Sequence, residues 1–144
     1  FGPKLRVLKQ ALWFLKFRPR SEAEVKKYLD KKGVAGAEIN EVIEKLKRLK
    51  LVNDEEFVGF WLRRRESRPR ASRVIKLELK KLGVDGELID RVLGDQKQAD
   101  RQRAAQVAEK LRGKEREKVI SALTRRGFAW EVIRTVVDGK KTGE

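Results

Sequence analysis

The chain has 144 residues, enough for one domain or for a few small modules that share apolar surface. Its 37 Lys and Arg residues against 22 Asp and Glu residues give a net charge of +15, which indicates a polyanionic partner or an acidic protein surface. The absence of His and Cys excludes thiol nucleophiles, disulfide frameworks and the usual zinc fingers.

The first predicted element is an amphipathic helix over residues 4–17. Pro19 ends it, because proline lacks the backbone N–H and clashes with the preceding turn. Ser21 followed by Glu24 is a capping-box signature, so a second helix should begin there. The predicted apolar stripe of the first helix consists of Leu5, Leu8, Leu12 and Leu15.

One phrase of sequence occurs three times, over residues 31–43, 80–93 and 125–137. Each copy carries a glycine with a basic residue two positions before it and apolar residues at matching positions around it. This spacing predicts a helix, a glycine in the left-handed conformation that stops it, and a second helix. The three glycines are Gly33, Gly83 and Gly127. The matching apolar residues are Val25, Leu29, Val34, Ile39 and Val42, then Ile75, Leu79, Val84, Ile89 and Val92, and finally Val119, Leu123, Phe128, Ile133 and Val136.

A further amphipathic helix precedes the second and third copies, over residues 54–65 and 100–111. Asn53 with Glu56 resembles a capping box for the earlier of these helices. Pro69 and Gly113 break the chain at the position that Pro19 takes in the first copy.

The pattern therefore predicts an all-α protein of three tandem three-helix modules, about nine helices in an elongated, curved array. The expected modules are residues 1–53, 54–94 and 95–144. One such module buries too little apolar surface to be very stable alone, so neighbours should share a core. The alternative, a compact bundle with accidental repeats, does not explain the aligned positions.

Two groups of cations are the candidate binding residues. The first follows the predicted helix over residues 54–65 and runs through a loop into the next helix, where arginine forks suit phosphate or carboxylate. Its members are Arg63, Arg64, Arg65, Arg68, Arg70 and Arg73. The second group is the basic residue two positions before each glycine, which are Lys31, Lys81 and Arg125. The alternative for both groups is a solvated face of cations at helix ends.

The sequence offers two other candidate sites. A helix–turn–helix could read DNA, but Glu38, Glu41 and Glu44 on the second helix of the first copy argue against insertion into the major groove. Most aromatic residues are expected in the core. Trp130 is the exception, because the other copies have Gly36 and Gly86 at its position, which predicts an exposed side chain available for contact.

No catalytic or cofactor site is predicted. The chain contains no glycine-rich phosphate loop, no carboxylate paired with a catalytic partner, no signal peptide and no apolar run long enough to span a bilayer. We expect a monomeric cytoplasmic protein that is not an enzyme, and Phe1 at the start suggests a trimmed N-terminus. Heat adaptation would also explain many charges, although it would not explain their one-sided sign.

Residues 49–93, "LKLVNDEEFVGFWLRRRESRPRASRVIKLELKKLGVDGELIDRVL", resemble the central signature of the RecX family. "RPRSEAEVKKYLDKKG" at residues 18–33 and "RRGFAWEVIRTVV" at 125–137 are similar to its first and last modules. Residues 94–111 match the family only in pattern.

The resemblance implies three three-helix modules and a partner, the RecA filament on single-stranded DNA. It implies that the protein lies in the filament groove and damps ATPase and strand exchange, which tempers DNA recombination, repair and the SOS response. It also implies direct DNA binding by some members and no cofactor. The rival interpretation is a general basic DNA-binding protein with no role specific to RecA, for which bare DNA would bind tightly and with a steep salt dependence.

Overall fold

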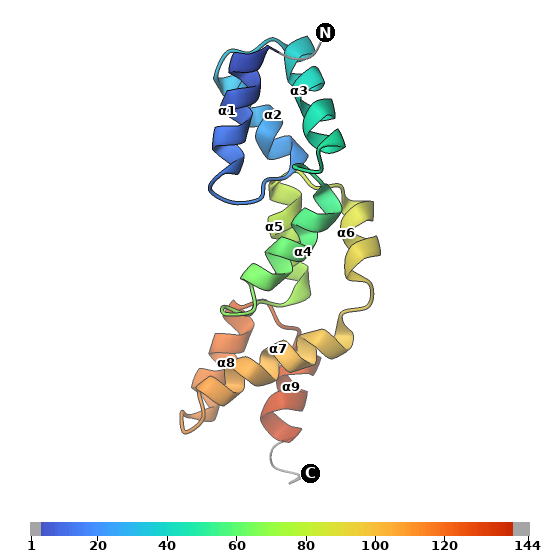
Figure 1. Cartoon of the computed structure of the whole chain (residues 1–144). Coiled ribbons are helices and arrows are strands. Elements are labelled where there is room, and N and C mark those ends of the chain that lie inside the picture. The colour runs from blue at the N-terminus through green and yellow to red at the C-terminus, as the bar shows by residue number, and fades with distance from the viewer. Residues whose placement is uncertain (1–3, 140–144) are drawn as a thin grey trace. The chain divides into compact units, whose positions relative to one another are not determined.

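The computed structural model describes residues 4–139, and within that range it contains nine α-helices and no strand (Figure 1). The all-α prediction is confirmed. The trimmed N-terminus inferred from Phe1 lies outside the described residues. The helices are α1 Leu5–Leu15, α2 Glu22–Lys31, α3 Gly36–Arg48, α4 Asp54–Arg64, α5 Ser72–Lys81, α6 Gly86–Leu93, α7 Lys97–Lys110, α8 Arg116–Arg125 and α9 Trp130–Gly139.

The contacts divide this part of the chain into two compact units. Unit 1 contains residues 4–61 and 79–92, and unit 2 contains residues 62–78 and 93–139. Helices α4 and α5 each contribute residues to both units. This division follows packing, and the module boundaries expected from the repeats stay a prediction.

In unit 1 the helices α1, α2 and α3 pack around one apolar core. The stripe predicted for α1 is wrong in part, because Leu5 and Leu12 are 63% and 40% exposed while Val7 and Ala11 are buried. The apolar face of α1 is broad, and packing buries the part of it that carries Val7 and Ala11. The buried core residues are Val7, Ala11, Val25, Leu29, Ile39, Val42, Ile43, Leu46 and Val52.

In unit 2 the helices α7, α8 and α9 pack together around a second core. Its buried residues are Ala71, Ala104, Val107, Leu123, Phe128 and Ile133. Of the residues aligned across the repeats, Val34, Val119 and Val136 are partly buried and Val92 is exposed, at 37%. The short α6 ends at Leu93, and Leu93 is the residue that it buries instead.

Each of the three glycines completes the same helix stop. Gly33, Gly83 and Gly127 have φ of 80°, 87° and 91°. The residue after each glycine donates its backbone N–H to a carbonyl in the last turn of the preceding helix, as Val34 does to Leu29 at 3.1 Å. This pairing is the Schellman motif, which satisfies carbonyls that the helix end leaves without partners.

In unit 1 the start of α2 is tied to the second glycine turn and to α4. Ser21 caps α2 by accepting from the Glu24 N–H at 3.1 Å, and its Oγ donates to the Leu82 carbonyl at 2.5 Å. Asp54, the first residue of α4, accepts from the Glu22 N–H at 2.9 Å. These bonds satisfy three backbone groups, which are the N–H groups of Glu22 and Glu24 and the carbonyl of Leu82.

Unit 2 repeats this arrangement one module later. The Ala71 N–H donates to the Arg126 carbonyl at 3.0 Å, next to the third glycine turn. Asp100 of α7 accepts from the Ser72 N–H at 2.9 Å and from the Ser72 hydroxyl at 2.6 Å. In each unit, the start of one helix pair is thus hydrogen-bonded to the glycine turn of the next pair. We call this contact the joint.

Candidate polyanion-binding surfaces

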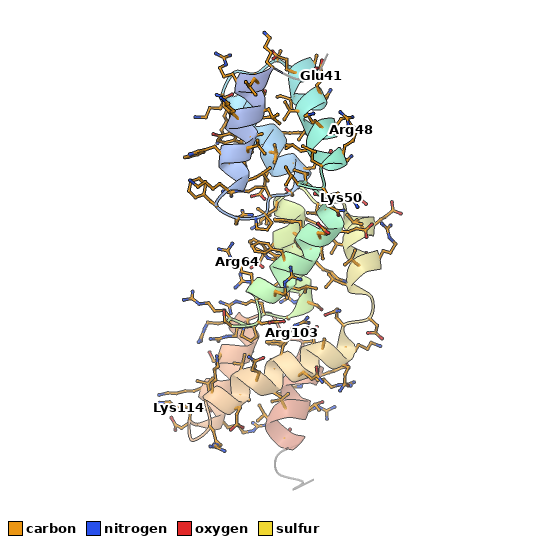
Figure 2. All side chains as sticks on the ribbon, viewed as in Figure 1. Glu41, Arg48, Lys50, Arg64, Arg103 and Lys114 are labelled. Atoms are coloured by element: carbon orange, nitrogen blue, oxygen red, sulfur yellow. The ribbon has the colours of Figure 1, made fainter. Side chains whose placement is uncertain are left out.

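The predicted arginine segment lies in unit 2. Arg63 and Arg64 end α4, and Arg73 lies in the first turn of α5. Figure 2 labels Arg64 and shows the many long side chains that surround the ribbon. Four of the predicted arginines are exposed: Arg63, Arg64, Arg68 and Arg73.

Arg65 and Arg73 bond to other segments of unit 2. Arg65 forms a two-pronged ion pair with Glu78, with Nε 3.0 Å from Oε1 and Nη2 against Oε2. Arg73 donates from Nε to the Gly127 carbonyl at 2.8 Å, so it links α5 to the third glycine turn. Both side chains therefore stabilise unit 2, and their substitution would change the fold as well as the surface.

Arg70 lies among other cations. Burial, and then the charges of Arg65 and Arg126, lower the pKa of the Arg70 guanidinium. Arg68 adds a further like charge, and Glu78 opposes it. An arginine remains protonated at neutral pH, so this group of cations keeps its charge and favours an anion that would relieve the repulsion. We define the arginine cluster as Arg65, Arg68, Arg70 and Arg126.

Sequence reasoning missed Arg126. It lies far from Arg70 in the chain, and the joint between α5 and the third glycine turn brings the two together. A basic residue directly before Gly127 was the available signal, since its neighbour Arg125 was predicted. Arg125 itself is exposed in unit 2 and donates to the Ser121 hydroxyl at 2.9 Å.

Lys31 and Lys81 line one hollow of about 320 Å³ in unit 1. The joint that bonds Ser21 to Leu82 places the end of α5 beside α2, so these two lysines of different repeats meet. Glu24 is the acidic lining residue, and Arg18 already pairs with it at 2.6 Å. Lys27 lines it as well, so the hollow offers three exposed lysines to an anion.

Trp130 is 55% exposed, which confirms the exposure predicted from the small residues at its position in the other copies. Its use as a contact stays a prediction. The expectation that most other aromatic residues are buried fails for Trp13 and Phe17, which are 55% and 59% exposed.

Within residues 4–139, no three His, Cys, Asp or Glu side chains are grouped so that they could hold a metal ion. Over the same range, no helix combines the length and apolar character that crossing a bilayer requires. The surfaces on this part of the chain are cationic, with arginine forks and lysines as the groups available to a ligand.

The fold and these surfaces define an all-α protein of repeated helix–glycine turn–helix elements that presents basic side chains. Two family models match it, described as the first three-helix domain of RecX over residues 8–46 and the second three-helix domain of RecX over residues 53–93. The chain belongs to the RecX family.

Curated relatives carry the same family name. The "Regulatory protein RecX" of Geobacillus thermodenitrificans is 35% identical over 92% of this chain and 53% of its own length. That of Mycolicibacterium vanbaalenii is 33% identical over 99% of this chain and 85% of its own length. The chain spans about half the length of the first of these relatives.

A solved structure shares the fold. The crystal structure of RecX from Lactobacillus salivarius superposes with a TM-score of 0.80 and 24% identity, covering 95% of this chain and 96% of that one. At this level of identity the likeness supports the arrangement of helices and says nothing of the ligands.

Proposed function

We propose that this protein regulates the RecA recombinase by binding the RecA filament on single-stranded DNA. It would lie in the filament groove and damp ATPase and strand exchange, which would temper recombination, repair and the SOS response. It would act as a cytoplasmic monomer, without catalysis of its own. The observation that carries the proposal is the match to two RecX domains.

The arginine cluster supports this function physically. Burial and neighbouring cations already disfavour the positive charge of Arg70. A phosphate or carboxylate placed there would relieve this repulsion as well as form new contacts. The hollow at Lys31 and Lys81 offers a second anion contact in unit 1. Several weak contacts in one chain would add avidity on a partner that itself repeats.

The test is a titration of RecA ATPase on single-stranded DNA, beside binding of the protein to the same DNA without RecA. Inhibition at concentrations far below those needed for bare DNA supports the proposal. Equal concentrations would instead favour the rival function, a general DNA-binding protein that competes for DNA.

A double variant tests the surface. Arg63→Glu with Arg68→Glu reverses two exposed arginines and spares the Arg65–Glu78 pair. We expect inhibition to need about tenfold more protein, since reversed charges repel phosphates. We also expect the dependence of this inhibition on salt concentration to change. Arg112→Glu with Lys114→Glu is the matched control, because it lowers the net charge equally at exposed positions of the α7–α8 loop (Figure 2 labels Lys114). Equal effects of the two doubles would contradict the choice of surface.

A further inference from the structure

A second hollow in unit 1 lies between α1 and the end of α2. It has a volume of about 400 Å³, and Arg6, Lys9, Gln10, Trp13, Tyr28 and Lys32 line it. We call it the α1 hollow. It differs from the hollow at Lys31 and Lys81 in all of its lining residues except Tyr28.

The charged lining residues of the α1 hollow are all cations. Arg6, Lys9 and Lys32 are exposed, and none of them forms an ion pair within the described part of the chain. Lysines and arginines that converge without carboxylates attract an anion such as a phosphate.

Two aromatic rings border the same space. Trp13 is 55% exposed and meets the edge of Phe17 at 4.8 Å between ring centroids. Tyr28 stacks on Phe14 at 4.2 Å with parallel planes, and the Arg20 guanidinium covers the other face of Phe14 at 3.9 Å. The Tyr28 ring is thus held by a packed column, while Trp13 leaves indole surface in water. Exposed aromatic surface beside cations is the arrangement on which unpaired bases stack.

The Gln10 side chain adds a polar group that lacks a partner. Its Oε1 atom is buried and accepts no hydrogen bond within residues 4–139. A buried acceptor without a donor costs free energy, and rotation of the Gln10 side chain into the hollow would bring Oε1 to a ligand with an N–H group. The edge of a nucleobase supplies such a donor, whereas a bare phosphate does not.

We propose that the α1 hollow binds one unpaired nucleotide of a single-stranded nucleic acid. Trp13 stacks on the base, Gln10 accepts from its edge, and Arg6, Lys9 and Lys32 contact the flanking phosphates. A duplex hides the faces of its bases, and an acidic peptide would use only the cations. This site does not depend on the proposed action on RecA, because it needs no filament.

Fluorescence anisotropy of labelled oligothymidylate of about ten nucleotides, without RecA, tests the site. Trp13→Ala should weaken binding about tenfold or more, while Trp13→Phe should retain most of it. Lys9→Gln with Lys32→Gln should flatten the dependence of log K on log salt by about 0.7 for each lysine. Oligouridylate should show the same Trp13 dependence, since base and phosphate are common to RNA and DNA.

Two comparisons make the test decisive. Leu77→Ala is the control, because Leu77 has a similar exposure of 53% and lies in unit 2. We expect it to leave the affinity within about twofold, and an abasic oligonucleotide to bind weakly and without regard to Trp13. An equal loss on Leu77→Ala, or equal affinity for abasic and thymidylate strands, would overturn the proposal. Thermal melts of all variants establish that they remain folded.

Discussion

Val74 leaves no space for a side chain on Gly127: a Cβ atom added to Gly127 would overlap the Cγ2 atom of Val74. Gly83 meets the Ala23 Cβ atom in the same way in unit 1. Gly33, by contrast, has no atom within 4 Å of an added Cβ. Gly83 and Gly127 are therefore required both by their positive φ and by the close approach of a neighbouring helix, while Gly33 is required by φ alone.

Alanine at the three glycines should separate these two causes. Gly33→Ala should lower the free energy of unfolding by about 1 kcal/mol, the cost of a left-handed residue with a side chain. Gly83→Ala and Gly127→Ala should add about 1–3 kcal/mol of overpacking. Gly83→Ala should be the worst, because the Cβ of Ala23 cannot rotate away as the Val74 side chain can.

Urea denaturation of the three variants measures the differences. Gly33→Ala serves as the control for backbone strain. Equal losses at Gly33 and Gly83 would mean that the joint relaxes and that the close approach contributes little.

The glycine stops and most of the shared core could be predicted from sequence, because both depend on local spacing along one or two helices. Leu29, Leu79 and Leu123 recur four residues before the glycine and are fully buried. Where local spacing leaves a choice, tertiary packing decides. The broad apolar arc of α1 permits several core faces, and the structure places Val7 and Ala11 inward rather than Leu5 and Leu12.

The candidate sites were less predictable, since they depend on residues far apart in the chain. The charge run around Arg68 was visible in the sequence, but the approach of Arg126 was not. The pairing of Arg65 with Glu78 was also hidden, and it changes which arginines can be exchanged without harm to the fold. A helix start such as that of α7, three residues earlier than Asp100, carries only a weak local signal.

Asp54 provides a pH-dependent test of the joint in unit 1. Burial raises the pKa of its carboxyl above the ordinary value of 3.8, with a further contribution from Glu22, although the Glu22 N–H opposes the shift. The folded protein thus holds this proton more tightly than the unfolded chain. The stability that Asp54 contributes is greatest below its unfolded pKa and falls as pH rises through its folded pKa.

Asp54→Asn keeps an oxygen that can accept from the Glu22 N–H but cannot ionise. We expect it to match or exceed the wild type in stability at pH 7, with an advantage that shrinks as pH falls toward 4. Asp54→Ala removes the acceptor and should cost about 1 kcal/mol at pH 7. Thermal melts between pH 3 and pH 7 provide the measurement. If the asparagine and alanine variants lose equally at pH 7, the carboxylate charge itself stabilises the start of α2.

Lys50, which Figure 2 labels, is the one non-glycine residue among residues 4–139 for which the structure gives a positive φ, and this angle is 61°. It occupies the glycine position of a fourth Schellman motif, in which the Leu51 N–H donates to the Leu46 carbonyl at 2.9 Å. Lys50→Gly should therefore stabilise the protein by about 0.5–1 kcal/mol, because relief of the backbone strain exceeds the added entropy of the unfolded chain.

Chemical denaturation measures this change as a higher midpoint with an unaltered slope. Lys50→Ala is the control, since it removes the same charge and keeps the strain. A gain shared by both variants would identify charge repulsion, and not the backbone, as the cause.

Glu78 is the carboxylate that opposes the positive charge of the arginine cluster, through its pair with Arg65. Glu78→Gln keeps the shape of the side chain and removes its charge. We expect the free energy of unfolding to fall by about 1 kcal/mol at low ionic strength, because the cations would repel one another without this carboxylate. The fall should be smaller at high salt, where such repulsion is screened.

Polyphosphate should raise the melting temperature of the Glu78→Gln variant more than that of the wild type, since it supplies the missing anion. Glu109→Gln, which removes the carboxylate paired with exposed Arg112, is the matched control and should show little of either effect. A loss at Glu78 that ignores both salt and polyphosphate would mean that this pair acts through packing, and that the cluster holds no repulsion for an anionic partner to relieve.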